Sequence, residues 1–218
     1  MKRLVLAWLL LCAIAAVADT SFLKPPAGSS IAIAVWEDMQ CPECARAYPT
    51  IMEAGKRYNV PVLLFDFPLG PVHPWSGEAA LLARYFDTQS KQLGDDFRTY
   101  IYQNQPQITP GNLRQYAERF ASQHNVALPF AIDPQGQLAG KIQADKALGM
   151  RLPVEHTPTI YVVVNTASGT SVREVPDRTQ LVTFLEQARH DAVPAKAAPA
   201  AAKATPKAGA KKAAAKKQ

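Results

Sequence analysis

Apolar and polar positions divide the chain into strand-like and helix-like stretches. Residues 31–36 are apolar without polar alternation, which is typical of a strand buried on both faces, and residues 60–67 are a second such run. Residues 42–58, between them, are predicted to form a helix that Pro49 should kink. A strand, a helix and a strand in this order predict a βαβ unit with parallel strands.

From residue 76 to about residue 152 the apolar spacing is helical. The first helix has an apolar face at five positions: Ala79, Ala80, Leu82, Ala83 and Phe86. Residues 96–103 are predicted as a second, shorter segment. Thr109 and Asp133 each precede a proline and are predicted to cap two further helices, the last of which ends near Met150. These segments predict a helical insertion.

Strand patterning returns after the insertion. Residues 159–164 are apolar, residues 165–170 are predicted to turn, and residues 171–175 should return as the hairpin partner. Residues 177–189 follow as an amphipathic helix. Residues 19–193 are therefore predicted to be one α/β domain with the order β-α-β, helical block, β-β-α.

Residues 1–18 have the features of a secretory signal peptide. Lys2 and Arg3 form a basic start, an apolar run follows, and residues 16–18 are a small-x-small cleavage site. We therefore expect the mature chain to begin at Asp19 and to be exported, to the periplasm or a comparable compartment. A retained membrane anchor is the alternative.

Residues 194–218 differ from the domain in composition. They are rich in alanine, lysine and proline, with seven lysines and no acid, which predicts a disordered basic tail. We favour a solubilising extension, and contact with an anionic surface is the alternative. The tail and the first residues account for the net charge of +6, so the domain itself is weakly acidic and nucleic acid is not an expected partner.

Cys41 and Cys44 are the candidate reactive residues, because they lie between the first predicted strand and its helix. Unpaired N–H groups and the helix dipole favour a thiolate at Cys41, and the thiolate is the form that attacks a disulfide. Cys44 can then close the ring and release the partner. The remaining cysteine, Cys12, lies in the predicted signal peptide. Two cysteines with scattered histidines do not make a zinc site, so no metal or cofactor is expected beyond a redox-active Cys41–Cys44 disulfide. A small structural staple is the alternative.

Three motifs together resemble the DsbA-like group of the thioredoxin superfamily. Residues 37–44, Glu-Asp-Met-Gln-Cys-Pro-Glu-Cys, look like its active-site run. Residues 156–159, His-Thr-Pro-Thr, look like its cis-proline loop, and Pro49 is similar to the proline of its active-site helix. The resemblance covers residues 31–192 and implies a thioredoxin fold with an inserted helical subdomain.

The resemblance also implies roles for individual residues. Cys41 would be the nucleophile and Cys44 the resolving cysteine of protein thiol–disulfide exchange. The backbone of Thr157, before cis Pro158, would pair with an extended substrate segment. The positions of two further residues are typical of the family, and these residues would tune the site: Asp38 and Pro42.

Two positions depart from the family pattern. The superfamily often has a buried acid where this chain has Val35, so proton transfer to Cys44 needs another group, such as water or Glu37. Glu43, between the cysteines, should raise the pKa of Cys41 and make a milder oxidant, unless it points to water and is screened. His73 is expected at the surface or as a helix cap, and an approach to the site is the alternative.

The sequence thus predicts an exported thiol–disulfide oxidoreductase, acting as a mild dithiol oxidase. Its partners would be reduced or disulfide-bonded proteins and a membrane redox protein that reoxidises or reduces it. A reductase or isomerase is one alternative, although residues 19–30 are too short for the dimerisation domain of the usual periplasmic isomerases. A non-catalytic peptide-binding chaperone is the other.

Overall fold

The computed structural model describes residues 19–152 and 154–194. The predicted signal peptide and the basic tail from residue 195 onward lie outside the described residues. None of the helices within the described ranges has the length and apolar character needed to cross a membrane.

Four strands form one mixed sheet in the order β2-β1-β3-β4. Their bounds are Ile31–Glu37 (β1), Val62–Asp66 (β2), Thr159–Thr166 (β3) and Gly169–Glu174 (β4). β1 runs parallel to β2 and antiparallel to β3, and β3 is antiparallel to β4. The predicted βαβ and ββα units are therefore confirmed, and β1 lies at the centre of the sheet.

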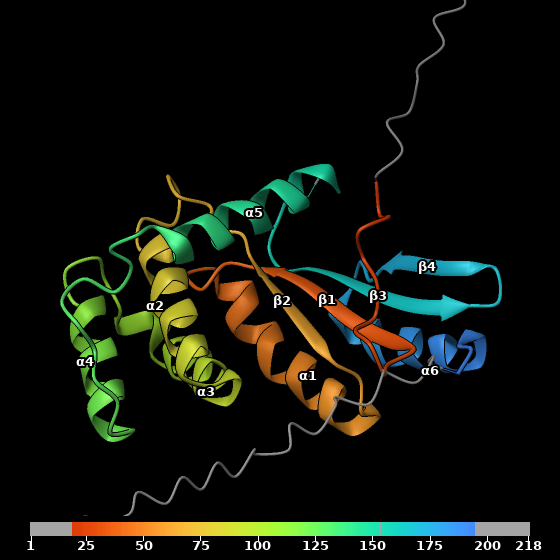
Figure 1. Ribbon diagram of the computed structural model, residues 1–218, viewed down its shortest axis with the longest axis horizontal. Helices are drawn as coiled ribbons and strands as arrows, with labels where there is room; N and C mark the ends of the chain where they lie inside the picture. The colour runs from red at the N-terminus through yellow and green to blue at the C-terminus, as the bar shows by residue number, and fades with distance from the viewer. Residues whose placement is uncertain (1–18, 153, 195–218) are drawn as a thin grey trace, which may run out of the picture.

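Helices cover both faces of this sheet (Figure 1). On one face, α1 (Pro42–Tyr58) and α6 (Leu181–Asp191) bury a core with β1 and β3 that includes Val35, Ile51 and Leu185. On the other face lies α5 (Gln137–Arg151). The core of that face includes Trp36, whose ring N–H donates to Asp145 O at 3.1 Å.

The other helices of the predicted insertion gather at one end of the sheet (Figure 1). They are α2 (Ser76–Gln89), α3 (Lys91–Asn104), a 3₁₀ helix (Gln105–Gln107) and α4 (Leu113–Gln123). Their core contains three packed rings, Phe86, Phe97 and Phe120, with centroids 4.6 to 5.2 Å apart. Both Cys41 and Cys44 belong to the same buried cluster. The helical block therefore packs directly against the cysteine end of α1.

Two predicted helix starts were wrong by three residues. α4 begins at Leu113 rather than after Thr109, because Asn112 Oδ1 accepts from the Thr109 N–H and stabilises a turn there. α5 begins at Gln137 rather than after Asp133. The Asp133 carboxylate nevertheless accepts from two N–H groups of the first turn of α5, so its capping function is retained from outside the helix.

Other boundaries shift for similar local reasons. The second segment of the insertion starts at Lys91 instead of residue 96, because the Ser90 hydroxyl accepts from Leu93 N–H and caps it. β2 is shorter than residues 60–67, since the Val60 N–H closes the end of α1 by donating to Gly55 O.

Candidate active site

Cys41 is placed at the N-terminus of α1 by a turn and a proline. Cys41 is the N-cap, and Pro42 takes the first helical turn, where a missing N–H leaves no bond unmade. The Cys41 N–H donates to Asp38 O, which closes the turn from β1. Both cysteines are thiols, with Cys41 7% exposed and Cys44 1% exposed. Cys41 is therefore the more accessible sulfur of the two.

Hydrogen bonds to the Cys41 thiolate lower its pKa to about 5, and the bond from the Cys44 thiol is the largest of them. The Thr157 hydroxyl and the N–H groups of Cys44 and Glu43 act in the same direction, while burial opposes them. The protonated sulfur also has a partner, since it donates to Thr157 O at 3.2 Å. The pKa of Cys41 is lowered overall, so the hydrogen-bond donors to the thiolate outweigh the effect of burial. Cys41 is therefore ionised at neutral pH, in the form that exchanges disulfides.

Cys44 has the opposite character. Burial raises the pKa of Cys44 well above the ordinary thiol value, and the neighbouring Cys41 raises it further. The Asp38 N–H donates to Cys44 Sγ at 3.4 Å and offsets part of this rise. The two sulfurs thus differ as a nucleophile and a resolving thiol should, and the assignment of these roles stays a prediction.

The Thr157–Pro158 peptide bond is cis, as the resemblance implies. Beside it lies a groove of about 330 Å³, whose lining includes Glu43, His156 and Arg178. Thr157, whose carbonyl oxygen accepts from Cys41 Sγ, belongs to the lining of this groove. The binding roles of Thr157 and Pro158 themselves stay predictions.

Glu43 is held by two arginines. It pairs with Arg46, one turn further along α1, and with Arg178 at 3.0 Å. These contacts lower the pKa of Glu43, the hydrogen bond from Arg46 most of all. Two guanidinium charges beside one carboxylate oppose the expected effect of Glu43 on the Cys41 thiolate.

Asp38 is buried beneath the Cys41 turn. Its carboxylate accepts from the N–H groups of Gln40 and Leu69, both at 2.7 Å. His73 Nδ1 lies 2.9 Å from Asp38 Oδ2. The favoured surface or capping role of His73 was therefore wrong, and the alternative holds: its side chain, 18% exposed, approaches the active-site turn at Asp38. Asp38 connects this turn to the loop before α2, and its tuning role stays a prediction.

Glu37 is a second buried acid of the site. Val35 is apolar and buried, as the sequence indicated, and belongs to the core under α1. Glu37 accepts from Tyr102 Oη at 3.0 Å and lies 3.2 Å from Arg98 Nε. Burial raises the pKa of Glu37 to about 7, against the opposing charge of Arg98. Its charge also raises the pKa of Cys44, so the two groups are electrostatically coupled.

No sequence motif pointed to three residues of the helical block that reach the site. Arg98 and Tyr102 lie on the buried face of α3, and Gln105 begins the following 3₁₀ helix. Gln105 Nε2 donates to Met39 O and Cys41 O. The sequence held one signal of this contact: Arg98 is a charged residue among the apolar positions of a helix face, which indicates a buried polar partner.

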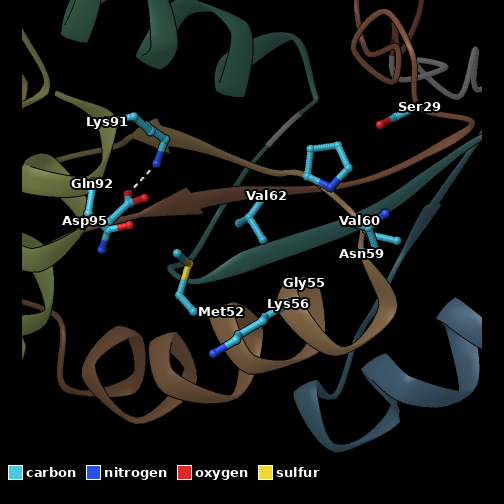
Figure 2. Close-up of a pocket in the computed structure, with 11 residues that line it drawn as sticks. Ser29, Met52, Gly55, Lys56, Asn59, Val60, Val62, Lys91, Gln92 and Asp95 are labelled. Carbon is cyan, nitrogen blue, oxygen red and sulfur yellow. Dashed lines mark hydrogen bonds and ion pairs between the residues drawn. The ribbon is translucent and has the colours of Figure 1, made fainter.

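A larger cavity lies away from the cysteines. It has a volume of about 670 Å³ and lies between α1, β2 and the start of α3, with Met52, Val62 and Lys91 in its lining (Figure 2). Lys91 forms an ion pair with Asp95 at its side (Figure 2). None of the described residues that line it is a cysteine or belongs to the cis-proline loop.

Comparison with known proteins places these features in context. Residues 27–187 match the family described as thioredoxin. The structure is similar to α-DsbA1 of Wolbachia pipientis, with a TM-score of 0.60, 16% identity and coverage of 80% of this chain and 96% of that chain. It is also similar to Pseudomonas aeruginosa DsbA2, with a TM-score of 0.54, 14% identity and coverage of 73% and 89%. Proteus mirabilis ScsC in a transitional conformation gives a TM-score of 0.56, 15% identity and coverage of 73% and 68%.

One curated relative is a much longer protein. The Na(+)/H(+) antiporter NhaA 3 of Salinispora tropica is 26% identical over 145 residues, which are 66% of this chain and 22% of that protein. The chain therefore spans less than a quarter of the curated relative that it matches. The solved structures, in contrast, are covered over most of their length, and they establish a DsbA-like thioredoxin fold.

Proposed function

The chain belongs to the thioredoxin family, and on that premise we propose that it is an exported protein thiol–disulfide oxidoreductase acting as a dithiol oxidase. The observation that carries the proposal is the contrast between the two sulfurs. The pKa of Cys41 is lowered to about 5, whereas burial holds the pKa of Cys44 well above its ordinary value. A stabilised thiolate stabilises the reduced protein, which is a property of an oxidant.

The reaction begins with the Cys41–Cys44 disulfide. A substrate thiolate attacks Cys41 Sγ, the sulfur–sulfur bond breaks, and its electron pair goes to Cys44, which takes up a proton. A second substrate thiolate then attacks the substrate sulfur of the mixed disulfide and releases Cys41 as a thiolate. The substrate loses two electrons and gains a disulfide, and the protein gains two electrons. The low pKa of Cys41 favours this release, because a more acidic thiol leaves faster.

Glu37 is the group that we assign to the proton of Cys44. With its pKa raised to about 7 by burial, it holds a proton in a useful fraction of molecules at neutral pH. Its charge raises the pKa of Cys44, so ionisation of Glu37 favours the protonated form of Cys44. Val35 cannot take this role because it has no titratable group.

The cycle needs an oxidant to restore the disulfide, and we propose a membrane redox protein for this step. The substrates would be reduced proteins whose extended segments lie in the groove beside Thr157 and Pro158. Glu43 was expected to make the oxidant mild. Its pairing with Arg46 and Arg178 limits that effect, so the strength of the oxidant depends on how far the two arginines neutralise it.

Cysteine variants test the proposal. Cys41→Ser should abolish catalysed disulfide formation in a reduced test protein, and Cys44→Ala should accumulate mixed disulfides through Cys41. A chaperone would bind the unfolded protein in both variants and trap none of it covalently. Equilibration with glutathione buffers then gives the reduction potential of the Cys41–Cys44 pair, which indicates whether the protein oxidises or reduces its substrates. A potential near −120 mV supports an oxidase, and one near −270 mV indicates a reductase.

A further inference from the structure

The turn that carries Cys41 is held by polar contacts at every residue. It comprises residues 37–41, from the last residue of β1 to the residue before α1. The contacts come from segments after β2: Arg98 and Tyr102 to Glu37, Leu69 to Asp38, Trp75 to Gln40, and Gln105 to Met39 and Cys41. Of these residues, only Gln105 bonds to the backbone of Cys41 itself.

Gln105 bridges two carbonyl groups with one amide. Its Nε2 lies 3.0 Å from Met39 O and 3.1 Å from Cys41 O. Both partners can only accept, so the amide nitrogen, with its two N–H groups, must face the turn. Met39 is 1% exposed and Cys41 is 7% exposed, so water has little access to replace these bonds.

The two bonds fix the direction of the peptide groups around Cys41. Cys41 O also accepts from the Ala45 N–H at 3.1 Å, as the first hydrogen bond of α1. A carbonyl held from two directions orients the start of the helix. In this orientation the N–H groups of Glu43 and Cys44 act on the Cys41 sulfur and lower its pKa.

We propose that Gln105 is a positioning residue that keeps Cys41 reactive. The helical block thereby acts on the sulfur through the backbone of the turn, without touching substrate. The effect on turnover rests on the proposed oxidoreductase function, whereas the effect on the Cys41 thiolate does not. A purely structural role, in which the amide only satisfies two buried carbonyls, would alter stability and leave the thiolate unchanged.

A graded series at one position separates the two roles. Gln105→Leu removes both donors, Gln105→Glu turns acceptors toward the carbonyls, and Gln105→Lys restores donors. Gln107 provides matched controls with the same replacements, because it lies in the same 3₁₀ helix and is exposed. The thiolate pKa is measured from its ultraviolet absorbance, and the alkylation rate is measured at pH 4, in the reduced chain.

Gln105→Leu should raise the pKa of Cys41 by about 1 and slow alkylation at pH 4 about 10-fold. Gln105→Glu should raise the pKa further, and Gln105→Lys should keep it at or below the wild-type value. The Gln107 variants should change it by less than about 0.3. A Gln105 series that follows the Gln107 series overturns the proposal, as does a Gln105→Leu protein that is less stable but has the wild-type thiolate pKa.

The two hypotheses fail in different ways. If Gln105 variants change the thiolate pKa while the wild-type protein catalyses no disulfide exchange, the positioning role stands and the proposed function is wrong. If the wild type is an active oxidase and its Gln105 variants retain the pKa of Cys41, the positioning role is wrong. If Gln105→Leu does not fold, the Glu and Lys variants still decide the question when compared with the same replacements at Gln107, because only Gln105→Glu should raise the pKa of Cys41.

Discussion

The two sides of Cys41 use the same kinds of charged residues in different surroundings. Toward the helical block, Glu37 and Arg98 are 3% and 1% exposed. Toward the groove, the side chains of Glu43 and Arg178 are 49% and 37% exposed. The contact distances are similar, 3.2 Å for the buried pair and 3.0 Å for the open one. Burial, and not the presence of an ion pair, therefore separates the two sides.

The physical reason is solvent screening. Water and salt weaken the attraction of the exposed pair, whereas the buried charges are desolvated and depend on one another. Breaking a buried pair leaves a charge that neither water nor a counterion stabilises. We therefore expect substitutions on the block side to change stability and proton binding, and substitutions on the groove side to change the redox properties slightly.

Replacing Arg98 should give the largest effect. Arg98→Met removes the partner of Glu37 and both bonds to the Asp87 carboxylate, at 3.0 and 2.9 Å. At pH 8, where Glu37 is largely ionised, we expect the free energy of unfolding in urea to fall by about 3–5 kcal/mol. The double variant Arg98→Met with Glu37→Gln should recover part of this loss, because it no longer buries the Glu37 charge.

Lys91→Met is the matched control for this comparison. Lys91 lies on the same helix and pairs with Asp95, but its side chain is 63% exposed. Its loss should cost less than about 1 kcal/mol. Equal losses for the two variants would show that burial does not distinguish the pairs.

Glu37→Gln should change how stability depends on pH. The pKa of Glu37 is raised from 4.5 to about 7 in the folded protein, so between these values the folded state holds a proton that the unfolded state has released. The free energy of unfolding therefore falls as pH rises through this window, by roughly 3 kcal/mol from this group. Urea titrations at several pH values should show a shallower fall for Glu37→Gln.

Part of that fall should remain in the variant, because burial also raises the pKa of Asp145, to about 6. Glu53→Gln on the exposed face of α1 is the control, and its pH dependence should follow that of the wild type. A Glu37→Gln profile as steep as the wild-type profile would mean that Glu37 does not hold the proton.

Local patterns explain what could be predicted from the sequence. The apolar runs identified β1 and β3, and the position of Cys41 between a strand and a helix indicated its place at the N-terminus of α1. The start of α4 was missed because the Asn112 side chain accepts from the Thr109 N–H and stabilises a turn before the helix. The start of α5 was missed because the Asp133 side chain caps the first turn from outside the helix. Element type was thus easier to predict than element boundary.

The contacts that shape the site could not be predicted in the same way. Gln105 lies 66 residues from Met39, and Arg178 lies 135 residues from Glu43. No spacing rule connects positions so far apart, and only the packing of the helical block and the C-terminal segment brings them together. The sequence could therefore identify Glu43 as a charge near Cys41 but not the arginines that surround it.

Glu43→Gln should give the smallest effect, and it tests the groove side of Cys41 directly. Removal of the carboxylate stabilises the Cys41 thiolate and makes the protein more oxidising. The arginine partners already neutralise Glu43, however, so we expect a potential within about 20 mV of the wild type.

Arg178→Gln should shift the potential in the reducing direction, because it leaves Glu43 less neutralised. Equilibration with glutathione buffers measures both shifts. A change well above this limit in Glu43→Gln would mean that the groove side sets the potential, and the contrast between the two sides of Cys41 would then not hold.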